Sequence, residues 1–503
     1  MASADRRQPD HSVAPDHTVA IIGAGFGGLA AGIKLQERGI DDYVIFDRNN
    51  DVGGTWLANQ YPGVEVDIPS VTYSYKFALN PDWSQVFAPG AELLQYARDI
   101  AERYGIRRHI RFETPVTAAD FDESTDLWTI TTASGDTVTA RFLISCHGAL
   151  STPATPDLPG LESFSGKVLR SASWDHDYDL TGKKVAVIGT GATGIQIIPT
   201  IAPRVQHLTV LQRTAIWVLP KPNAPVPGLV RSIYRRIPKL QLLPRFLIDS
   251  TFEIAETVGV VYNKQLPAIT RGVEKLCLRH LRGQVKDKHL REQLTPHYGY
   301  ACKRPSFSND YFPTFNRDNV DLETAPIRRI TSTGIEFADG RTLEIDTLIL
   351  ATGFKIFDLP YQISGIDGQD LAKTWESERM HAYEGITVPG FPNLFLAPGP
   401  YGVIGFSWFD TIDLCVTHAV QVVAKAVASG SSRVSVTDAQ TAEFVAKMRK
   451  KVRSTVFASP RCAGSNTYYI NAQGDSPYLR PTTRIESALS LRKALKDGYE
   501  YSA

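Results

Sequence analysis

Two short apolar runs, each followed at once by a glycine fingerprint, constrain the fold of this 503-residue chain more than any other feature. Residues 17–22 (HTVAII) and 183–188 (KKVAVI) are each followed by a helix-like stretch and a further β-rich run, at residues 43–46 and 208–211. A strand, a glycine-rich turn, a helix and a second strand form the start of a βαβ unit. We therefore predict an α/β fold with two Rossmann-like dinucleotide-binding domains.

The first fingerprint is Gly23-x-Gly25-x-x-Gly28, and Asp47 follows its last glycine by 19 residues. Such glycines allow a tight turn, a close approach of a pyrophosphate and close packing of helix on strand. A carboxylate at the Asp47 position accepts hydrogen bonds from ribose hydroxyls and repels a 2′-phosphate, so this unit should hold FAD or NAD. The alternative is a solvated turn aspartate. The residues predicted to bind this cofactor are Gly23, Gly25, Phe26, Gly28, Asp47 and Arg48.

The second fingerprint carries the opposite charge at the same spacing. Arg213 follows its last glycine, Gly194, by 19 residues. The guanidinium offers a fork of donors that fits a phosphate, so this unit should select NADP(H). The alternative is an ordinary surface arginine. The predicted NADP residues here are Gly189, Gly191, Thr193, Gly194, Arg213 and Thr214.

One nucleotide of each kind indicates hydride flow from a reduced nicotinamide to a flavin. The five cysteines stand far apart and form no CxxC pair, so we expect them to be reduced thiols without a disulfide framework, a zinc site or a redox-active dithiol. They are Cys146, Cys277, Cys302, Cys415 and Cys462. The electron acceptor should then be oxygen, a quinone or a metal protein.

Composition shifts along the chain suggest how the domains are divided. Residues 120–139 alternate apolar and polar side chains around Ser134-Gly135, as in an antiparallel hairpin, and residues 151–160 (STPATPDLPG) have the composition of a linker. We expect a disordered tail over 1–16, a first FAD-binding part over 17–150, an NADP-binding domain over 151–345 with a helical insertion at about 225–300, and a second FAD-binding part with a C-terminal lid segment over 346–503.

Overall charge gives no indication of a nucleic-acid or membrane partner. The chain has 54 basic and 53 acidic residues, and the basic stretch 231–239 is expected to be a solvated helix face. No apolar run is expected to approach the ~20 residues that cross a bilayer, and the polar N-terminus is not a signal peptide. We therefore expect a cytoplasmic protein without a membrane span.

Residues 53–67 (GGTWLANQYPGVEVD) fit the pattern [AG]GxWxxxx[FY]P[GM]xxxD at every constrained position. In this the chain resembles the class B flavoprotein monooxygenases, and it is most similar to the Baeyer–Villiger monooxygenases. The resemblance extends from about Val19 to Pro481. It implies that Asp67 lies near the flavin ring, and that Gly54, Thr55 and Trp56 help to bind FAD.

Further segments support the resemblance. Within Cys302-Lys303-Arg304 it implies that Arg304 enters the active site and that Lys303 approaches the 2′-phosphate of NADP. It also implies that the strand-end motif Ala351-Thr352-Gly353 and the pair Gly399-Pro400 lie near the cofactors. Departures are Arg170 in place of the family histidine, residues 405–408 (GFSW) in place of a GHNS-like stretch, and Tyr468 at a tryptophan position.

The resemblance implies an NADPH- and O2-dependent FAD monooxygenase that inserts oxygen into a ketone through a C4a-peroxyflavin and releases an ester or lactone. Arginine suits this chemistry because it stays protonated at any working pH, and a carboxylate partner would orient it. We expect Arg304 and Asp67 to be the catalytic pair, against the alternative of a surface ion pair. The expected partners are O2 and a small-molecule substrate.

Other possibilities remain at this point. S- or N-oxygenation, an electron-transfer flavoprotein and a non-catalytic nucleotide-binding protein are alternative functions. Residues 454–477 are either a lid over NADP or an ordinary surface loop. His147, which precedes Gly148 at a predicted strand end, could line a cofactor edge.

Overall fold

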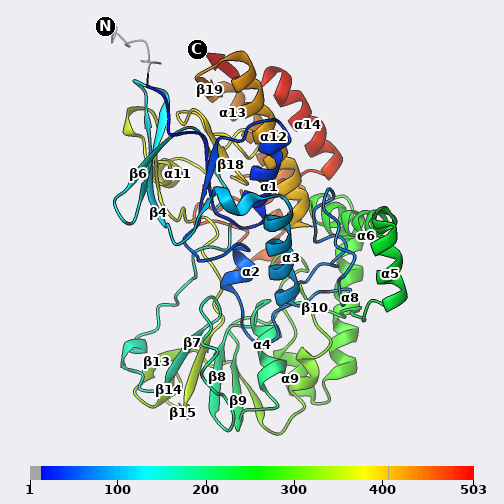
Figure 1. Cartoon of the computed structure of the whole chain (residues 1–503). Coiled ribbons are helices and arrows are strands. Elements are labelled where there is room, and N and C mark those ends of the chain that lie inside the picture. Colours follow the sequence, from blue (N-terminus) through cyan, green and yellow to red (C-terminus); the bar gives the residue numbers. More distant parts are fainter. Residues whose placement is uncertain (1–12, 406, 503) are drawn as a thin grey trace.

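The structure is a computed structural model that describes residues 13–405 and 407–502. Figure 1 shows a sheet at each end of the molecule, with helices along one side. Residues 1–12 of the tail expected over 1–16 lie outside the described residues. Asp16, the last residue of the expected tail, is held in place, because its carboxylate accepts hydrogen bonds from the backbone N–H and the hydroxyl of Thr139.

The first sheet contains the first fingerprint. Within the described residues it has eight strands in the order β17-β4-β5-β6-β1-β2-β3, with β18 also paired to β6. The strands β6, β1, β2 and β3 are parallel neighbours, and β4, β5 and β6 form an antiparallel meander. The strands are β1 (His17–Ile22), β2 (Tyr43–Phe46), β3 (Ile110–Arg111), β4 (Val116–Asp122), β5 (Leu127–Thr132), β6 (Thr137–Ser145), β17 (Gln362–Ser364) and β18 (Leu394–Leu396).

The second sheet is wholly parallel. In the part of the chain that the structure describes, its order is β12-β9-β8-β16-β7, and the second fingerprint follows β8. The strands are β7 (Lys167–Arg170), β8 (Lys184–Ile188), β9 (His207–Leu211), β12 (Val320–Glu323) and β16 (Thr347–Leu350). Each fingerprint thus follows a central strand with parallel neighbours on both sides, which is where doubly wound folds bind nucleotides. The predicted fold class, with two Rossmann-like units, is confirmed.

Three smaller sheets complete the strand structure of the described residues. The antiparallel set β13 (Ile327–Thr331), β14 (Gly334–Phe337) and β15 (Thr342–Glu344) lies beside the second sheet. The pairs β10 (Val218–Leu219) with β11 (Ser306–Phe307), and β19 (Arg433–Ser435) with β20 (Glu500–Ser502), each join distant parts of the chain. The hairpin predicted around Ser134-Gly135 is confirmed as the turn between β5 and β6.

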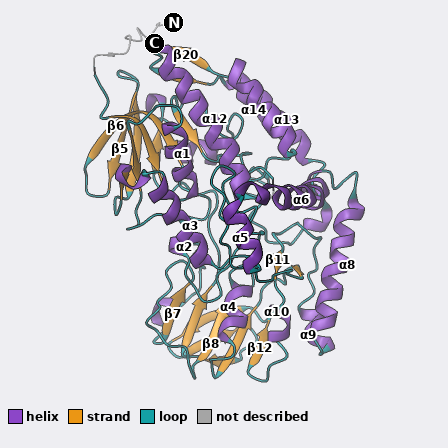
Figure 2. Cartoon of the chain, turned by 45° about the vertical axis from the view of Figure 1, so that its right-hand side comes forward, coloured by secondary structure: helices purple, strands orange, loops and turns teal. Residues whose placement is uncertain are grey.

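Helices cover both sheets and form a separate group along one flank (Figure 2). Those near the first sheet are α1 (Phe26–Gln36), α2 (Thr55–Ala58), α3 (Gly90–Arg103), α11 (Leu371–Ser377), α12 (Trp408–Ser429), α13 (Asp438–Val452) and α14 (Arg484–Asp497). Those near the second sheet are α4 (Gly194–Ile201) and α10 (Tyr311–Thr314). The flank group comprises α5 (Gly228–Arg236), η3 (Pro238–Gln241), α6 (Leu242–Phe252), the π-helix η4 (Glu253–Val258), α7 (Gly259–Val261), α8 (Pro267–Gln284) and α9 (Lys288–Gln293).

Helix α12 corrects the expectation about apolar runs. Among the described residues it is long and apolar enough to cross a bilayer by length and composition alone. Its side chains Phe409, Ile412, Val416 and Val423 are buried in the core that α12 forms with α1 and the first sheet. The polar Asp410 and Thr417 interrupt the run in the sequence and hide its length. The helix is apolar because it is central to the domain.

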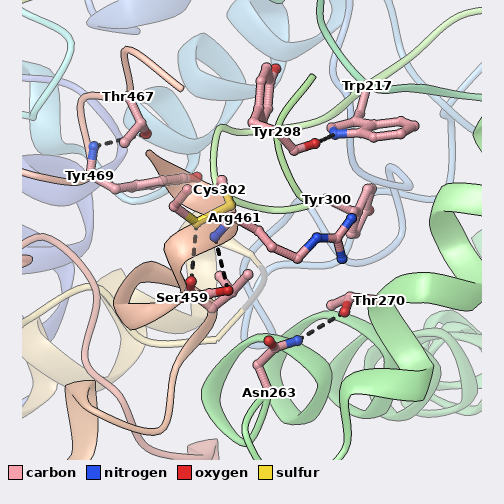
Figure 3. Close-up of a disulfide and its surroundings, with 12 residues drawn as sticks. Trp217, Asn263, Thr270, Tyr298, Tyr300, Cys302, Ser459, Arg461, Thr467 and Tyr469 are labelled. Atoms are coloured by element: carbon pink, nitrogen blue, oxygen red, sulfur yellow. Dashed lines mark hydrogen bonds between the residues drawn. A yellow bond between two sulfur atoms is a disulfide. The ribbon is translucent and has the colours of Figure 1, made fainter. Parts of the chain in front are cut away.

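The cysteine prediction is wrong for one pair. Cys302 and Cys462 form a disulfide between residues 160 positions apart, with their Cα atoms 5.1 Å apart (Figure 3). The Gly299 N–H donates directly to the Arg461 carbonyl, and Glu274 on α8 links the two segments because it pairs with Arg461 and accepts from the Tyr300 N–H. Sequence spacing cannot reveal a pair that the fold brings together in this way. The other cysteines, Cys146, Cys277 and Cys415, are buried thiols.

Candidate active site

The glycines of the loop between β1 and α1 allow close backbone approaches on both sides of the loop. Gly23 has φ +104°, and a Cβ on Gly28 would lie 1.8 Å from the Gly23 carbonyl oxygen, so strand and helix touch through these glycines. A Cβ on Gly25, at the helix start, would lie 3.5 Å from the Gly54 Cα. Phe26 begins α1 and is buried against Phe409. The loop therefore brings the Gly54-Thr55-Trp56 segment beside the first fingerprint.

Asp47 lies under this loop, at the end of β2. One carboxylate oxygen accepts a hydrogen bond from the Ala24 N–H at 2.6 Å, and the other accepts two from Asn49. A carboxylate has about four lone-pair positions, so Asp47 retains room for a ribose hydroxyl. Arg48 instead donates to the Ser151 carbonyl at 2.8 Å and thereby ties this edge to the linker. The structure thus gives Asp47 a loop-fixing contact that sequence reasoning did not include.

The second fingerprint repeats this geometry and leaves an open space at its middle glycine. A Cβ on Gly194 would lie 2.1 Å from the Gly189 carbonyl oxygen, whereas a Cβ on Gly191 would meet no described atom within 4 Å. Thr193 occupies the N-cap position of α4, and its side chain makes no capping hydrogen bond to a described residue.

Residues 351–353 close the other side of the second fingerprint. The Ala351 carbonyl oxygen faces Gly189, and the Thr352 hydroxyl donates to the Ala154 carbonyl in the linker. The Gly353 carbonyl accepts from the Ala154 N–H. The second fingerprint, the end of β16 and the linker therefore form one rim.

The cationic side chains of Lys303 and Arg213 lie near each other, and Arg213 follows the end of β9. Burial lowers the pKa of Lys303, and the nearby charge of Arg213 lowers it further. Neither forms an ion pair with a described residue. Asn466, in the segment predicted as a lid or loop, donates to the Thr214 hydroxyl at 3.3 Å. Sequence reasoning placed Asn466 in that segment but did not predict its contact with Thr214, because nothing local to the segment indicates it.

The ion pair between Arg304 and Asp67 forms as predicted. Arg304 Nε and Nη2 both donate to Asp67 Oδ2, at 3.1 Å and 2.7 Å. The carboxylate raises the pKa of Arg304 well above its ordinary value, although burial opposes this. No described residue accepts a hydrogen bond from Arg304 Nη1.

Aromatic rings surround this ion pair. Trp56 and Tyr73 meet edge to face at 5.7 Å, and Tyr469 packs against Tyr468 and Tyr478. Burial raises the pKa of Tyr73 and of Tyr478 above the ordinary value, so both hydroxyls stay neutral. The charge of Arg304 is therefore placed among neutral, largely apolar groups.

Two cavities meet near this cluster. The first is lined by Arg304, Pro305, Phe307, Val260, Val403 and Tyr469. The second is lined by His147, Gly399, Pro400, Trp375, Tyr478 and again Val403. Burial lowers the pKa of His147 to about 4, so this imidazole is neutral, and its Nδ1 lies 2.8 Å from the Ser145 hydroxyl. His147 therefore lies on the same cavity wall as Gly399 and Pro400.

The segment 61–67 connects the two fingerprint units. The Tyr61 hydroxyl donates to Gln196 Oε1 at 2.9 Å, and Gln196 Nε2 donates to the Glu65 carbonyl. The buried Lys221 lies 2.5 Å from Glu65 and donates to the Val66 carbonyl. Gln196 on α4 and Lys221 after β10 thus hold the segment 61–67, which ends at Asp67. Sequence reasoning missed both, and no local motif marks them.

The disulfide fixes the segment that carries Lys303 and Arg304. Cys302 precedes them directly, and its partner Cys462 lies on η7 (Pro460–Cys462), within residues 454–477. Figure 3 shows Tyr469 and Arg461 close to this bond. One point of the segment predicted as a lid or loop is therefore covalently attached to the segment that carries Lys303 and Arg304.

Arg170 is placed apart from these contacts. It ends β7 and donates through Nη1 to the Thr155 hydroxyl in the linker at 3.3 Å. The residue that replaces the family histidine therefore contacts the linker between the two sheets.

Comparison with known proteins identifies close relatives. Residues 16–225 match the family described as flavin-binding monooxygenase-like. A Baeyer-Villiger monooxygenase of Streptomyces coelicolor is 35% identical over 489 residues, covering 96% of this chain and 92% of the relative. Closed cyclohexanone monooxygenase matches with TM-score 0.86 and 26% identity, over 98% of this chain and all of the other. The OTEMO complex with FAD and NADP matches with TM-score 0.87 and 27% identity, over 97% of this chain and all of the other.

Proposed function

This chain belongs to the Baeyer–Villiger monooxygenases, which are NADPH-dependent flavoproteins, and we propose that its Arg304–Asp67 pair supplies the fixed positive charge on which oxygen transfer depends. The observation that carries this proposal is the double contact of Arg304 with one oxygen of Asp67. It occupies two of the three guanidinium nitrogens and leaves Nη1 for the reacting groups.

The residues fit the two cofactors that the family uses. The close approach of Gly25 to Gly54 and the buried Asp47 suit FAD, which activates O2 when reduced. Open space at Gly191 and the two cations Lys303 and Arg213, which pair with no described carboxylate, suit the pyrophosphate and the 2′-phosphate of NADPH. We propose that FAD binds beside the first sheet (residues 17–150 and 346–503) and NADPH beside the second (151–345).

The chain's own groups would then act electrostatically. Arg304 stays protonated, and Asp67 raises its pKa further, so it stabilises negative charge that develops on oxygen without donating its proton. The rings of Tyr73 and Tyr478 stay neutral and add no competing charge beside the guanidinium, whose side chain is 38% exposed in this structure. Asp67 orients the guanidinium and takes no proton from the substrate.

We propose a ketone as the substrate and an ester or lactone as the product. A permanent cation favours an anionic, nucleophilic oxygen, which attacks a carbonyl carbon, whereas sulfur and nitrogen atoms require a neutral electrophilic oxygen. The cavity at Arg304 is walled by Val260, Phe307 and Val403, which suits an apolar substrate.

A substrate panel tests this choice. The parent and Arg304→Ala should be given cyclic, linear and aryl ketones together with sulfides, and the products analysed. The parent should convert a ketone to an ester, and the variant should lose this conversion while keeping bound FAD. A parent that oxidises only sulfides would establish heteroatom oxygenation instead.

We place the enzyme in the cytoplasm, where NADPH is regenerated. The Cys302–Cys462 disulfide runs against this placement, because structural disulfides are rare in reducing compartments. Trapping thiols in intact cells before lysis measures the redox state of the pair, and cell fractionation measures the compartment. Recovery of the protein in a secreted fraction would contradict the placement.

A further inference from the structure

The flank segment 228–254 exposes apolar side chains to an unusual degree. Of the seventeen large hydrophobic side chains that are exposed among the described residues, nine lie in this segment. They are Leu229, Ile233, Ile237, Leu240, Leu242, Leu243, Phe246, Leu247 and Ile254. Figure 1 shows α5 and α6 on the outer edge of the molecule, away from both sheets. Single exposed hydrophobic residues are ordinary, but a contiguous patch marks a surface that binds something.

Helix α6 has its polar residues inside and its apolar residues outside. Leu243 and Phe246 are 64% and 66% exposed, whereas Arg245 between them is 3% exposed. Arg245 donates to the carbonyl oxygens of Thr72 at 3.1 Å and Ser74 at 2.9 Å. A rotation that buried the leucines would remove these hydrogen bonds and leave a buried cation without partners. The outward apolar face is therefore fixed by the fold.

Helix α5 continues the same surface. Leu229, Ile233 and Ile237 recur every four residues and so share one helix face, and Leu229 is 74% exposed. Leu240 on η3 joins this stripe to the outward face of α6. Here the structure differs from the sequence expectation of a solvated basic helix, because the exposed surface carries an apolar stripe beside its arginines.

Charge decides between the possible occupants of this surface. The flank segment 228–254 contains four arginines and one lysine against two carboxylates, Asp249 and Glu253. Arg235 pairs with Asp82 at 2.6 Å and Arg245 with Asp249 at 3.5 Å. The remaining cations, Arg231, Arg236 and Lys239, form no ion pair with a described residue. A second copy of the chain docked here would bring like charges together.

We propose that α5, η3 and α6 form a docking surface for a lipid bilayer with anionic headgroups. Interfacial helices have this composition, with leucine and phenylalanine entering the acyl boundary and lysine and arginine at the headgroups. The chain then attaches to the membrane surface without crossing it.

The docking surface leads directly to the cavity at Arg304. Helix α6 runs into η4 and α7, whose residues Thr257, Val260 and Val261 line that cavity. A docked enzyme could take ketones dissolved in the membrane into this cavity, and this step rests on the proposed function above. The docking itself is independent of the proposed function, because it is measured without turnover.

The test is flotation of the FAD-loaded protein with phosphatidylcholine vesicles, with and without about one third phosphatidylglycerol. The parent should float with the anionic vesicles and remain in solution with the neutral ones. Leu243→Glu/Phe246→Glu should abolish flotation, and Arg236→Gln or Lys239→Gln should weaken binding about fivefold each. The matched control is Ile485→Glu/Leu489→Glu on α14, since these side chains are 75% and 59% exposed but lie outside the segment.

Sedimentation velocity and thermal melts accompany each variant, so that unfolding is recognised. A control that floats like the parent, together with a folded patch variant that does not, supports the proposal. It is overturned if the parent fails to float with anionic vesicles. It is also overturned if the parent is a dimer that Leu243→Glu/Phe246→Glu converts to monomers, because the patch would then bind a second copy.

Discussion

Replacing Arg213 with alanine should reduce the preference for NADPH over NADH. Burial and the neighbouring Arg213 charge both lower the pKa of Lys303, so the two cations repel each other until an anion lies between them. A 2′-phosphate relieves this repulsion and gains charge-assisted contacts with both groups. Loss of one such contact costs ~1.5–3 kcal/mol, which corresponds to about 10- to 150-fold in the ratio of kcat/KM values.

The assay is steady-state oxidation of NADPH and of NADH by each variant. Arg213→Ala should raise the KM for NADPH and leave NADH almost unaffected, and added salt should weaken NADPH binding less in the variant than in the parent. Arg204→Ala is the matched control, since Arg204 lies in the same sheet unit but is exposed and pairs with Asp179. An Arg213→Ala enzyme with the parent's ratio of NADPH to NADH would refute the placement of the 2′-phosphate.

Three further predictions concern stability. Cys302→Ser should lower the free energy of unfolding in urea by up to about 5 kcal/mol, since the disulfide closes a 160-residue loop, and reductant should destabilise the parent alone; equal sensitivity of both would contradict the bond. Burial lowers the pKa of His418 to about 3, so the unfolded chain binds a proton at a higher pH than the folded protein does. The resulting contribution to the free energy of unfolding is complete above about pH 6.5 and is lost as the pH falls, at about 1.4 kcal/mol per pH unit. His418→Gln should reduce this slope. Gly63→Ala places a Cβ 2.3 Å from the Thr200 hydroxyl and should lower the melting temperature more than Gly39→Ala, which meets nothing within 4 Å at a similar φ; equal effects would show that strain alone acts.

Local patterns in the sequence predicted the fold class. A βαβ unit is short, and its strand, its glycines and the charged residue that follows them, Asp47 or Arg213, lie within a few tens of residues. The charge of that residue determines which ribose it can bind, so sequence reasoning could distinguish the two nucleotide units. The structure added that Asp47 also fixes the fingerprint loop through Ala24.

Contacts between distant segments could not be predicted in this way. Arg304 and Asp67 stand 237 residues apart, and only the family resemblance suggested that they meet. The disulfide had no such resemblance behind it and was missed. The inverted burial of α6 was also missed, because periodicity shows that a helix has an apolar face but not which face the rest of the fold covers.

The most direct test of the central claim is a single-turnover measurement on Arg304→Ala. The enzyme is reduced anaerobically with NADPH and mixed with O2 and a ketone, and ester and hydrogen peroxide are counted per flavin. Loss of a preorganised charge costs ~3–4 kcal/mol, so ester formation should fall about 10²- to 10³-fold while FAD stays bound and hydrogen peroxide replaces the ester. Asp67→Ala should impair the same step, and the double variant should be little worse than Arg304→Ala alone. Ester formation by Arg304→Ala at the parent's rate would contradict the account.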